Sequence, residues 1–317
     1  MSVNIFSKPP KKDINSVRGD FLSTALNMYY HNPGHALWVA YELALFLKYK
    51  YHDPILDLGC GDGLFTYLLF NKTDDLLFDE ISFRLLGRSP IRYRENINEY
   101  LIGLDLNCKS IIHAKRLGLY SLLISGNACS LPFEDQSFST VISNCSLAWI
   151  PKADDALMEI SRVLKPGGLL AFTAPSDQFG THFPLGILFE RIKAFNLSNK
   201  YIAHRIIKSR ELYLLPLSAW TNKIINSGLQ ILDGEYYLPL RSATLADSLT
   251  SMNRARFGKI TFGAILRRLA LFPYLFNSTL IKYLFIQFYK KAFSKYYHEL
   301  NQGEKGAAFF FLARKNS

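Results

Sequence analysis

The segment from residue 55 to residue 70 places a short strand, a glycine turn and an apolar helix in direct succession. Ile55–Leu58 is an apolar run that predicts a buried parallel strand, and it carries one acid, Asp57, near its end. Glycines follow at positions 59, 61 and 63, and residues 64–70 predict an apolar helix. An open α/β sheet forms its ligand crevice from such turns, because glycine lets the backbone approach a ligand closely.

The glycine spacing argues against a dinucleotide site. The fingerprint G-x-G-x-x-G would need a third glycine at position 64, where this chain has Leu64. An acid on the preceding strand would repel a pyrophosphate, but it can hold an ammonium group directly or through water. The turn therefore favours a cationic nucleoside that has no phosphate.

Strand and helix patterns alternate along the rest of the chain. Leu101–Leu106 predicts a second strand that ends near Asp105, an acid placed to accept hydrogen bonds from both ribose hydroxyls of a nucleoside. Further strands are predicted at residues 119–124, 141–146, 169–174, 229–237 and 307–314, and helices at 21–50, 109–117 and 152–163, with another beginning at 217.

Four blocks of this pattern, in order, resemble the class I S-adenosylmethionine-dependent methyltransferases, of the type 11 kind. They are the acid and glycine turn at 57–63, Asp105, the stretch from Gly126 to Phe138, and the turn Leu164–Gly168. The third block is similar to the family's G-D-A-x-x-L-P-F-x-D-x-S-F, and the fourth to its L-x-P-G-G. The resemblance implies an α/β, Rossmann-like, seven-stranded and mostly parallel sheet with helices on both faces and helical cap insertions. It also implies S-adenosylmethionine as the cofactor.

The resemblance also implies which residues hold the cofactor. The glycine turn would surround its methionine part, Asp105 would take the ribose hydroxyls, and Asn127 with Ala128 would border the adenine. Asn127 stands where the family has an acid, but its amide oxygen can still accept a hydrogen bond from the adenine amino group. The full predicted set is Asp57, Gly59, Cys60, Gly61, Asp105, Leu106, Asn127, Ala128 and Asn144.

Methyl transfer needs a positioned acceptor, and some acceptors need a base as well. The family often has a histidine in an L-x-H pattern after the fourth strand, where this chain has Trp149. An aromatic wall for the acceptor and ordinary packing both fit Trp149. His31 and His35 are the candidate catalytic bases, although a lone histidine is more often structural, and Tyr30 is a candidate acceptor contact.

Positive charge is concentrated in the second half of the chain. The net charge is +11, and residues 181–317 hold 20 Lys or Arg against 7 Asp or Glu. Between Asp247 and Glu299 there are nine basic residues, many aromatic ones and no acid. This composition predicts that residues 248–298 touch an anionic membrane surface or a lipophilic acceptor. The alternative is that the aromatic residues pack on the sheet as a cap.

The predicted organisation has three parts. Residues 1–50 form a helical preface, and residues 51–238 with 306–317 form the methyltransferase domain. Within that domain, residues 71–100 are expected as a surface excursion and residues 176–216 as a substrate cap. Residues 239–305 form a basic, aromatic, helical insertion. The four cysteines have no C-x-x-C spacing, so we expect reduced thiols, no metal site and a cytoplasmic protein. The basic insertion adds the expectation of peripheral contact with the inner membrane face.

Three functions remain open from the sequence. The first is methylation, most simply O-methylation, of a small-molecule, saccharide or lipid-linked acceptor. The second is a non-catalytic cofactor-binding module that acts through its basic surface. The third is an RNA methyltransferase, against which no N-P-P-Y or D-P-P-Y tetrapeptide follows the fourth strand, where Ser143–Ser146 stand instead.

Overall fold

A computed structural model describes most of the chain. The described residues are 18–71, 78–84, 86–87, 100–209, 214–254, 256–257, 260–261, 264, 279–298 and 305–316. The start of the predicted preface, much of the 71–100 insert and residues 265–278 of the basic insertion lie outside these ranges.

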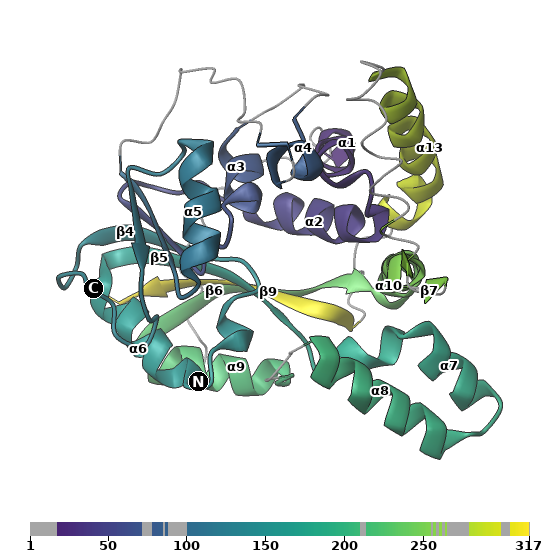
Figure 1. The fold of residues 1–317 in the computed structure, drawn as a ribbon. Coiled ribbons are helices and arrows are strands. Elements are labelled where there is room, and N and C mark those ends of the chain that lie inside the picture. Colours follow the sequence, from purple (N-terminus) through teal and green to yellow (C-terminus); the bar gives the residue numbers. More distant parts are fainter. Residues whose placement is uncertain are drawn as a thin grey trace.

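One seven-stranded sheet forms the centre of the molecule (Figure 1), with the strand order β3-β2-β1-β4-β5-β9-β6. The first five strands along the chain are parallel, and β9 runs antiparallel between β5 and β6. This arrangement confirms the predicted Rossmann-like sheet. The strands are β1 (Ile55–Leu58), β2 (Leu101–Asp105), β3 (Leu122–Ser125), β4 (Phe138–Ser143), β5 (Leu164–Pro175), β6 (Leu229–Pro239) and β9 (Gly306–Lys315).

Helices cover both faces of the sheet (Figure 1). One face is covered by α1 (Arg18–Tyr29), α2 (Pro33–Phe46), α3 (Leu64–Phe70), α4 (Glu80–Arg84) and α5 (Cys108–Leu117). The other face is covered by α6 (Ala153–Val163) and α9 (Leu217–Asn226). The helix α13 (Thr279–His298) packs against α1, on the outer side of the first layer.

The apolar run in β9 explains how one strand serves both layers. Alternate side chains of a strand point to opposite faces. Phe310 and Leu312 join the core beneath α2, whereas Phe309, Phe311 and Ala313 join the core beneath α6 and α9. All five are at most 1% exposed, so this strand is buried on both faces, as its continuous hydrophobic sequence requires.

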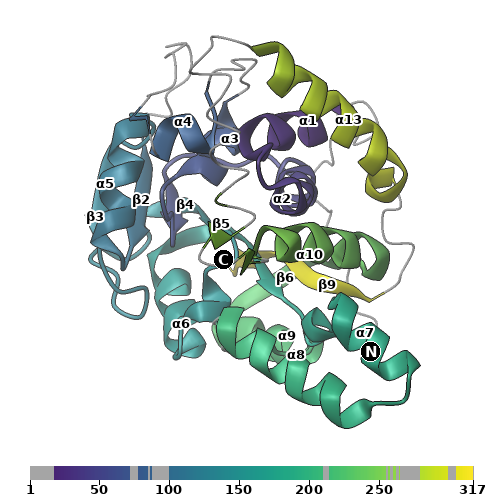
Figure 2. The ribbon, with the colours of Figure 1, turned by 45° about the vertical axis from the view of Figure 1, so that its right-hand side comes forward.

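Two insertions lie beside the strands β6 and β9 (Figure 2). After β5 the chain forms the 3-10 turn η2 (Phe179–His182) and the helical hairpin of α7 (Pro184–Arg191) and α8 (Phe195–Ser209). After β6 it forms α10 (Leu240–Arg254) and a short hairpin of β7 (Arg256–Phe257) and β8 (Ile260–Thr261). A buried ion pair, Arg205 to Asp247 at 2.5 Å, joins α8 to α10. The hairpin is thereby fixed to the body of the protein.

The expected surface excursion at residues 71–100 was wrong for its described helical part. Phe78, Ile81 and Phe83 are each at most 2% exposed, and Phe78 packs edge-on against Tyr67 of α3. The charged residues there suggested a solvated loop. Asp79, however, is buried because the Lys282 Nζ of α13 lies 2.7 Å from its carboxylate.

Candidate functional site

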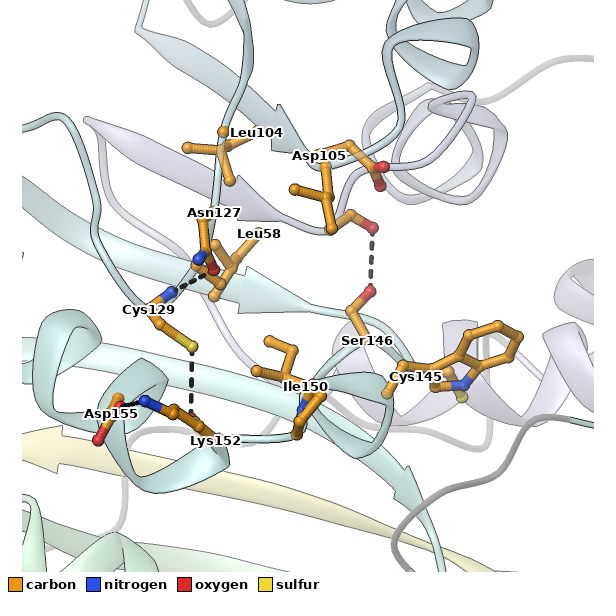
Figure 3. Close-up of a pocket in the computed structure, with 16 residues that line it drawn as sticks. Leu58, Leu104, Asp105, Asn127, Cys129, Cys145, Ser146, Ile150, Lys152 and Asp155 are labelled. Carbon is orange, nitrogen blue, oxygen red and sulfur yellow. Dashed lines mark hydrogen bonds and ion pairs between the residues drawn. The ribbon is translucent and has the colours of Figure 1, made fainter. Parts of the chain in front are cut away.

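A cavity of about 970 Å³ lies where the parallel strands β1, β2, β3 and β4 end (Figure 3). The chain order reverses between β1 and β4, which is where open α/β sheets bind ligands. The volume falls at the upper end of the roughly 300–1,000 Å³ that ligand sites occupy. Its lining comes from Leu58, Gly59, Leu104–Leu106, Gly126–Cys129, Cys145, Ser146, Trp149–Lys152 and Asp155.

The glycine turn is fixed to both neighbouring strands. The amides of Gly59 and Cys60 donate to the carbonyl of Leu104 at 2.7 and 3.1 Å. On the other side, the Ser146 hydroxyl donates to the carbonyl of Gly59 at 3.0 Å. A Cβ on Gly59 would lie 2.2 Å from that hydroxyl oxygen, so only glycine lets the end of β4 approach here. This glycine is required by the protein's own packing.

Gly61 has a different role. Its amide donates to the Asp105 carboxylate at 2.9 Å, and its φ of +56° favours glycine. No heavy atom lies within 4 Å of the position that a Cβ would take. The backbone therefore borders open space beside the Asp105 carboxylate, where a ligand can approach.

The Asp105 carboxylate is organised by backbone amides. One oxygen accepts from Gly61 and the other from Asn107, at 2.7 Å. Each carboxylate oxygen retains a second acceptor site, so the pair can still accept from two ribose hydroxyls. Asn127 accepts from the Cys129 amide at 3.0 Å, which holds its side chain on the cavity wall.

Five of the nine predicted cofactor residues line the cavity: Gly59, Asp105, Leu106, Asn127 and Ala128. Asp57, Cys60, Gly61 and Asn144 do not line it. Asp57 is 3% exposed, and one of its oxygens accepts from Thr66 and Tyr120 at 2.6 Å. Burial raises the pKa of Asp57 to about 6, although these two hydrogen bonds oppose the shift. Its role as a cofactor contact stays a prediction.

A family model described as a methyltransferase domain matches residues 56–172, which contain the whole cavity lining from Leu58 to Asp155. The chain carries a class I S-adenosylmethionine-dependent methyltransferase domain. The matched segment spans β1 to β5 and includes all four sequence blocks.

Curated relatives each match about half of the chain or less. Squalene methyltransferase 1 of Botryococcus braunii is 42% identical over 132 residues, which are 41% of this chain and 30% of the relative. Demethylmenaquinone methyltransferase of Lactobacillus johnsonii is 32% identical over 177 residues, 51% of this chain and 64% of the relative. Malonyl-[acyl-carrier protein] O-methyltransferase of Pectobacterium atrosepticum is 24% identical over 153 residues, which are 48% of this chain and 50% of the relative. The matches thus span less than two thirds of each of these relatives.

The cavity fits the cofactor of a methyltransferase domain, S-adenosylmethionine. The open space beside Gly61 allows the methionine part to approach the turn, and Asp105 presents acceptors to ribose hydroxyls. The apolar side chains of Leu106, which is 76% exposed, and Ile150 offer surfaces to a purine ring. The domain thus offers acceptors to the ribose hydroxyls and an apolar wall to the base.

One aromatic side chain, that of Trp149, lies in the wall of this cavity. Trp149 ends the 3-10 turn η1 (Leu147–Trp149) and is 46% exposed in the cavity wall. Tyr30, the other predicted acceptor contact, is 6% exposed, and the Lys282 Nζ lies 5.1 Å from the centre of its ring. It does not line the cavity, and its predicted role stays untested.

The two candidate bases lie where α1 meets α2, beside the glycine turn. His31 Nε2 lies 3.1 Å from the Glu80 carboxylate, and Arg84 bridges Glu80 to Asp62 of the turn at 3.0 and 2.6 Å. Burial opposes ionisation of Glu80, but the His31 hydrogen bond and the Arg84 charge bring its pKa down to about 2. A fixed carboxylate therefore orients the His31 ring.

The ring of His35 packs edge-on against Tyr29 with centres 4.6 Å apart, although the residue keeps part of its surface exposed. Desolvation by the surrounding protein lowers the pKa of His35 from its usual 6.5, although the charges of Glu80 and Glu42 oppose this. The ring is thus neutral at pH 7 and can accept a proton. Neither histidine lines the cavity.

Sequence reasoning missed Glu42, which connects α2 to the cavity wall. Its carboxylate is 2% exposed and accepts from four side chains: Trp38 Nε1 and Tyr237 OH at 2.8 Å, Asn144 Nδ2 at 3.0 Å and Cys145 Sγ at 3.1 Å. Cys145 has a left-handed φ of +52° and lines the cavity. The available signal was a lone acid in a helix that is otherwise nearly all apolar.

Replacing Asp105 by Ala should weaken binding of S-adenosylmethionine by about 1–3 kcal/mol, the scale of lost charge-assisted hydrogen bonds. This corresponds to roughly a 5- to 150-fold higher Kd in calorimetric titration. Asp135→Ala is the control, because Asp135 is an exposed acid that pairs with Arg162 outside the cavity lining. An unchanged Kd for the Asp105 variant would contradict the ribose assignment.

Proposed function

We propose that the protein transfers a methyl group from S-adenosylmethionine to a hydroxyl oxygen of a lipophilic or lipid-linked small molecule. The observation that carries the proposal is the cavity of the methyltransferase domain, which both Asp105 and Trp149 line. A polar nucleoside end and an apolar acceptor end are what this transfer requires.

Two kinds of observation support a lipophilic acceptor. Trp149 lines the cavity and leaves a large apolar side chain half-exposed there. Two relatives act, by their names, on squalene and on demethylmenaquinone, which are both lipophilic molecules. An indole face binds such a molecule by removing apolar surface from water.

The neutral histidine at the start of α2 supports an oxygen acceptor. Methylation of a hydroxyl forms a carbon–oxygen bond, breaks the sulfur–methyl bond and releases the hydroxyl proton. A neutral imidazole accepts that proton, and the low pKa of His35 keeps its ring in this form at pH 7. His31, paired with Glu80, supports the same region electrostatically.

The test is to incubate the protein with methyl-labelled S-adenosylmethionine and fractionated cell extract. Label is expected in the organic-soluble lipid or lipid-linked fraction. Hot hydriodic acid should release it as methyl iodide, because that reagent cleaves methyl ethers and leaves methyl groups on carbon in place. Label that hydriodic acid does not release would show that the acceptor atom is carbon and not oxygen. Label found only in RNA or protein would contradict the proposed acceptor class.

Single alanine changes at the histidines separate a base from a structural role. His35→Ala should lower kcat by about 100-fold, which is the scale of general-base catalysis. The Kd for S-adenosylmethionine should stay unchanged. In the wild type, the fall of kcat on acidification should have its midpoint below pH 6.5, because the pKa of His35 is lowered from that value. If His31→Ala and His35→Ala both turn over like wild type, water takes the proton.

A further inference from the structure

The helix α13 places one charged side chain, that of Lys282, on its buried face. The Nζ of Lys282 lies 2.7 Å from Asp79, and the two side chains are 1% and 0% exposed. Farther along the helix, Ile286, Phe293 and Tyr297 are also buried, and the Tyr297 hydroxyl donates to the carbonyl of Ala40 in α2. These contacts fix which face of the helix points outward.

The outward face is apolar. Leu280, Leu284 and Phe288 are spaced four residues apart, so they form one stripe along the helix, and they are 63%, 56% and 67% exposed. Tyr283 and Phe285 beside the stripe are each 46% exposed. A helix that faces water normally has the reverse arrangement, with its apolar side on the core and its charges outside.

Positive charge follows the stripe. Lys291 is exposed one turn after Phe288, and Lys290 is half-buried beside it. The sequence from residue 248 to residue 298, which contains the whole helix, has no acidic residue. An apolar face bordered by lysines complements a partner that has anionic groups at its surface and apolar material directly beneath them.

We propose that this outward face of α13, defined by Leu280, Tyr283, Leu284, Phe285 and Phe288, docks on the surface of an anionic lipid bilayer. The helix lies in the plane of the interface, with the stripe among the acyl chains and the lysines at the headgroups. In both views α13 stands at the outer edge of the molecule, beside α1 and α2 (Figures 1 and 2). None of the helices in the described ranges is long and apolar enough to span a membrane. The inference does not depend on the proposed acceptor.

Co-sedimentation with vesicles tests the surface directly. The wild-type protein should pellet with phosphatidylserine-containing vesicles at low salt, and pellet about tenfold less with purely phosphatidylcholine vesicles or at high salt. The double variant Leu284→Glu/Phe288→Glu should lose about tenfold or more of its vesicle binding. It leaves the buried face of the helix unchanged, and circular dichroism with thermal melting confirms that the variant is folded.

The matched control is Met158→Glu/Ile225→Glu, which adds the same two charges at exposed apolar residues of α6 and α9. This control should bind vesicles like wild type. Wild-type protein that stays in the supernatant with anionic vesicles at low salt would overturn the proposal, and so would unchanged binding by the α13 variant. Light scattering measures the alternative in which two copies of this chain bind each other through the face. A wild-type protein that is a dimer and does not bind vesicles, with an α13 variant that is a monomer, would assign the face to a second copy of this chain instead.

Discussion

A Gly61→Val protein should fold and yet show no measurable binding of S-adenosylmethionine. The added side chain projects into the space beside Asp105, where no protein atom lies within 4 Å of the Cβ position. If the methionine part of the cofactor fills that space, valine excludes it. Calorimetric titration should show at least a 100-fold rise in Kd, equivalent to about 2.7 kcal/mol.

The φ of +56° at Gly61 introduces a second effect, because valine is strained in that conformation. Gly167→Val separates the two effects. Gly167 has a φ of +76°, has no atom within 4 Å of its Cβ position, and lies exposed in the turn at the start of β5, outside the cavity lining. Its variant should lose comparable stability and keep its cofactor affinity. Equal affinity in both variants and wild type would remove Gly61 from the site.

Replacing Glu42 by Ala should lower the free energy of unfolding by about 3 kcal/mol or more. The change leaves the donors of Trp38, Tyr237, Asn144 and Cys145 without their shared acceptor. Each buried group that loses its partner costs about 1–3 kcal/mol. The Tyr237 hydroxyl cannot escape by ionising, because burial and the nearby Glu42 charge raise its pKa well above 10. Urea denaturation measures the loss.

Glu42→Gln distinguishes charge from shape at the same position. An amide oxygen still accepts from Trp38 and Tyr237, but its NH₂ group then faces the NH₂ group of Asn144. Asn144 cannot turn over freely, because its oxygen accepts from Thr173 at 2.6 Å. We expect an intermediate loss of stability and a raised Kd for S-adenosylmethionine, since Cys145 and Ser146 follow Asn144 on the cavity wall. Glu190→Ala, at an exposed acid of α7, is the control. Wild-type stability in both Glu42 variants would contradict this account.

The sheet was predictable because its strands carry their own signals. The apolar run of β9 and the acids that end β1 and β2 depend only on local sequence and on burial. The fourth strand was placed at residues 141–146, but it spans Phe138–Ser143. Residues 144–146 leave the sheet because they bond to Glu42, Thr173 and Gly59, which are distant in sequence.

The cavity wall was predictable only in part. Asp105, Asn127 and Trp149 could be recognised because each lies at or shortly after the carboxyl end of a strand. Asp57 shows the limit of such reasoning. Its carboxylate accepts from Thr66 of α3 and from Tyr120, which lies between α5 and β3. No spacing within the glycine motif indicates that Tyr120, 63 residues later, competes for this acid.

The position of β9 in the sheet sets an order on assembly during synthesis. In the finished sheet β9 lies between β5 and β6. Until residues 306–315 have left the ribosome, β5 is paired only with β4 and β6 has no partner strand. Residues 240–305 are made in the interval, which lasts about 3–13 s at ordinary elongation rates of roughly 5–20 residues per second. During that time the free edge of β5 and the unpaired β6 both present open hydrogen-bonding groups. We expect nascent chains of this protein to need protection by a chaperone in that interval.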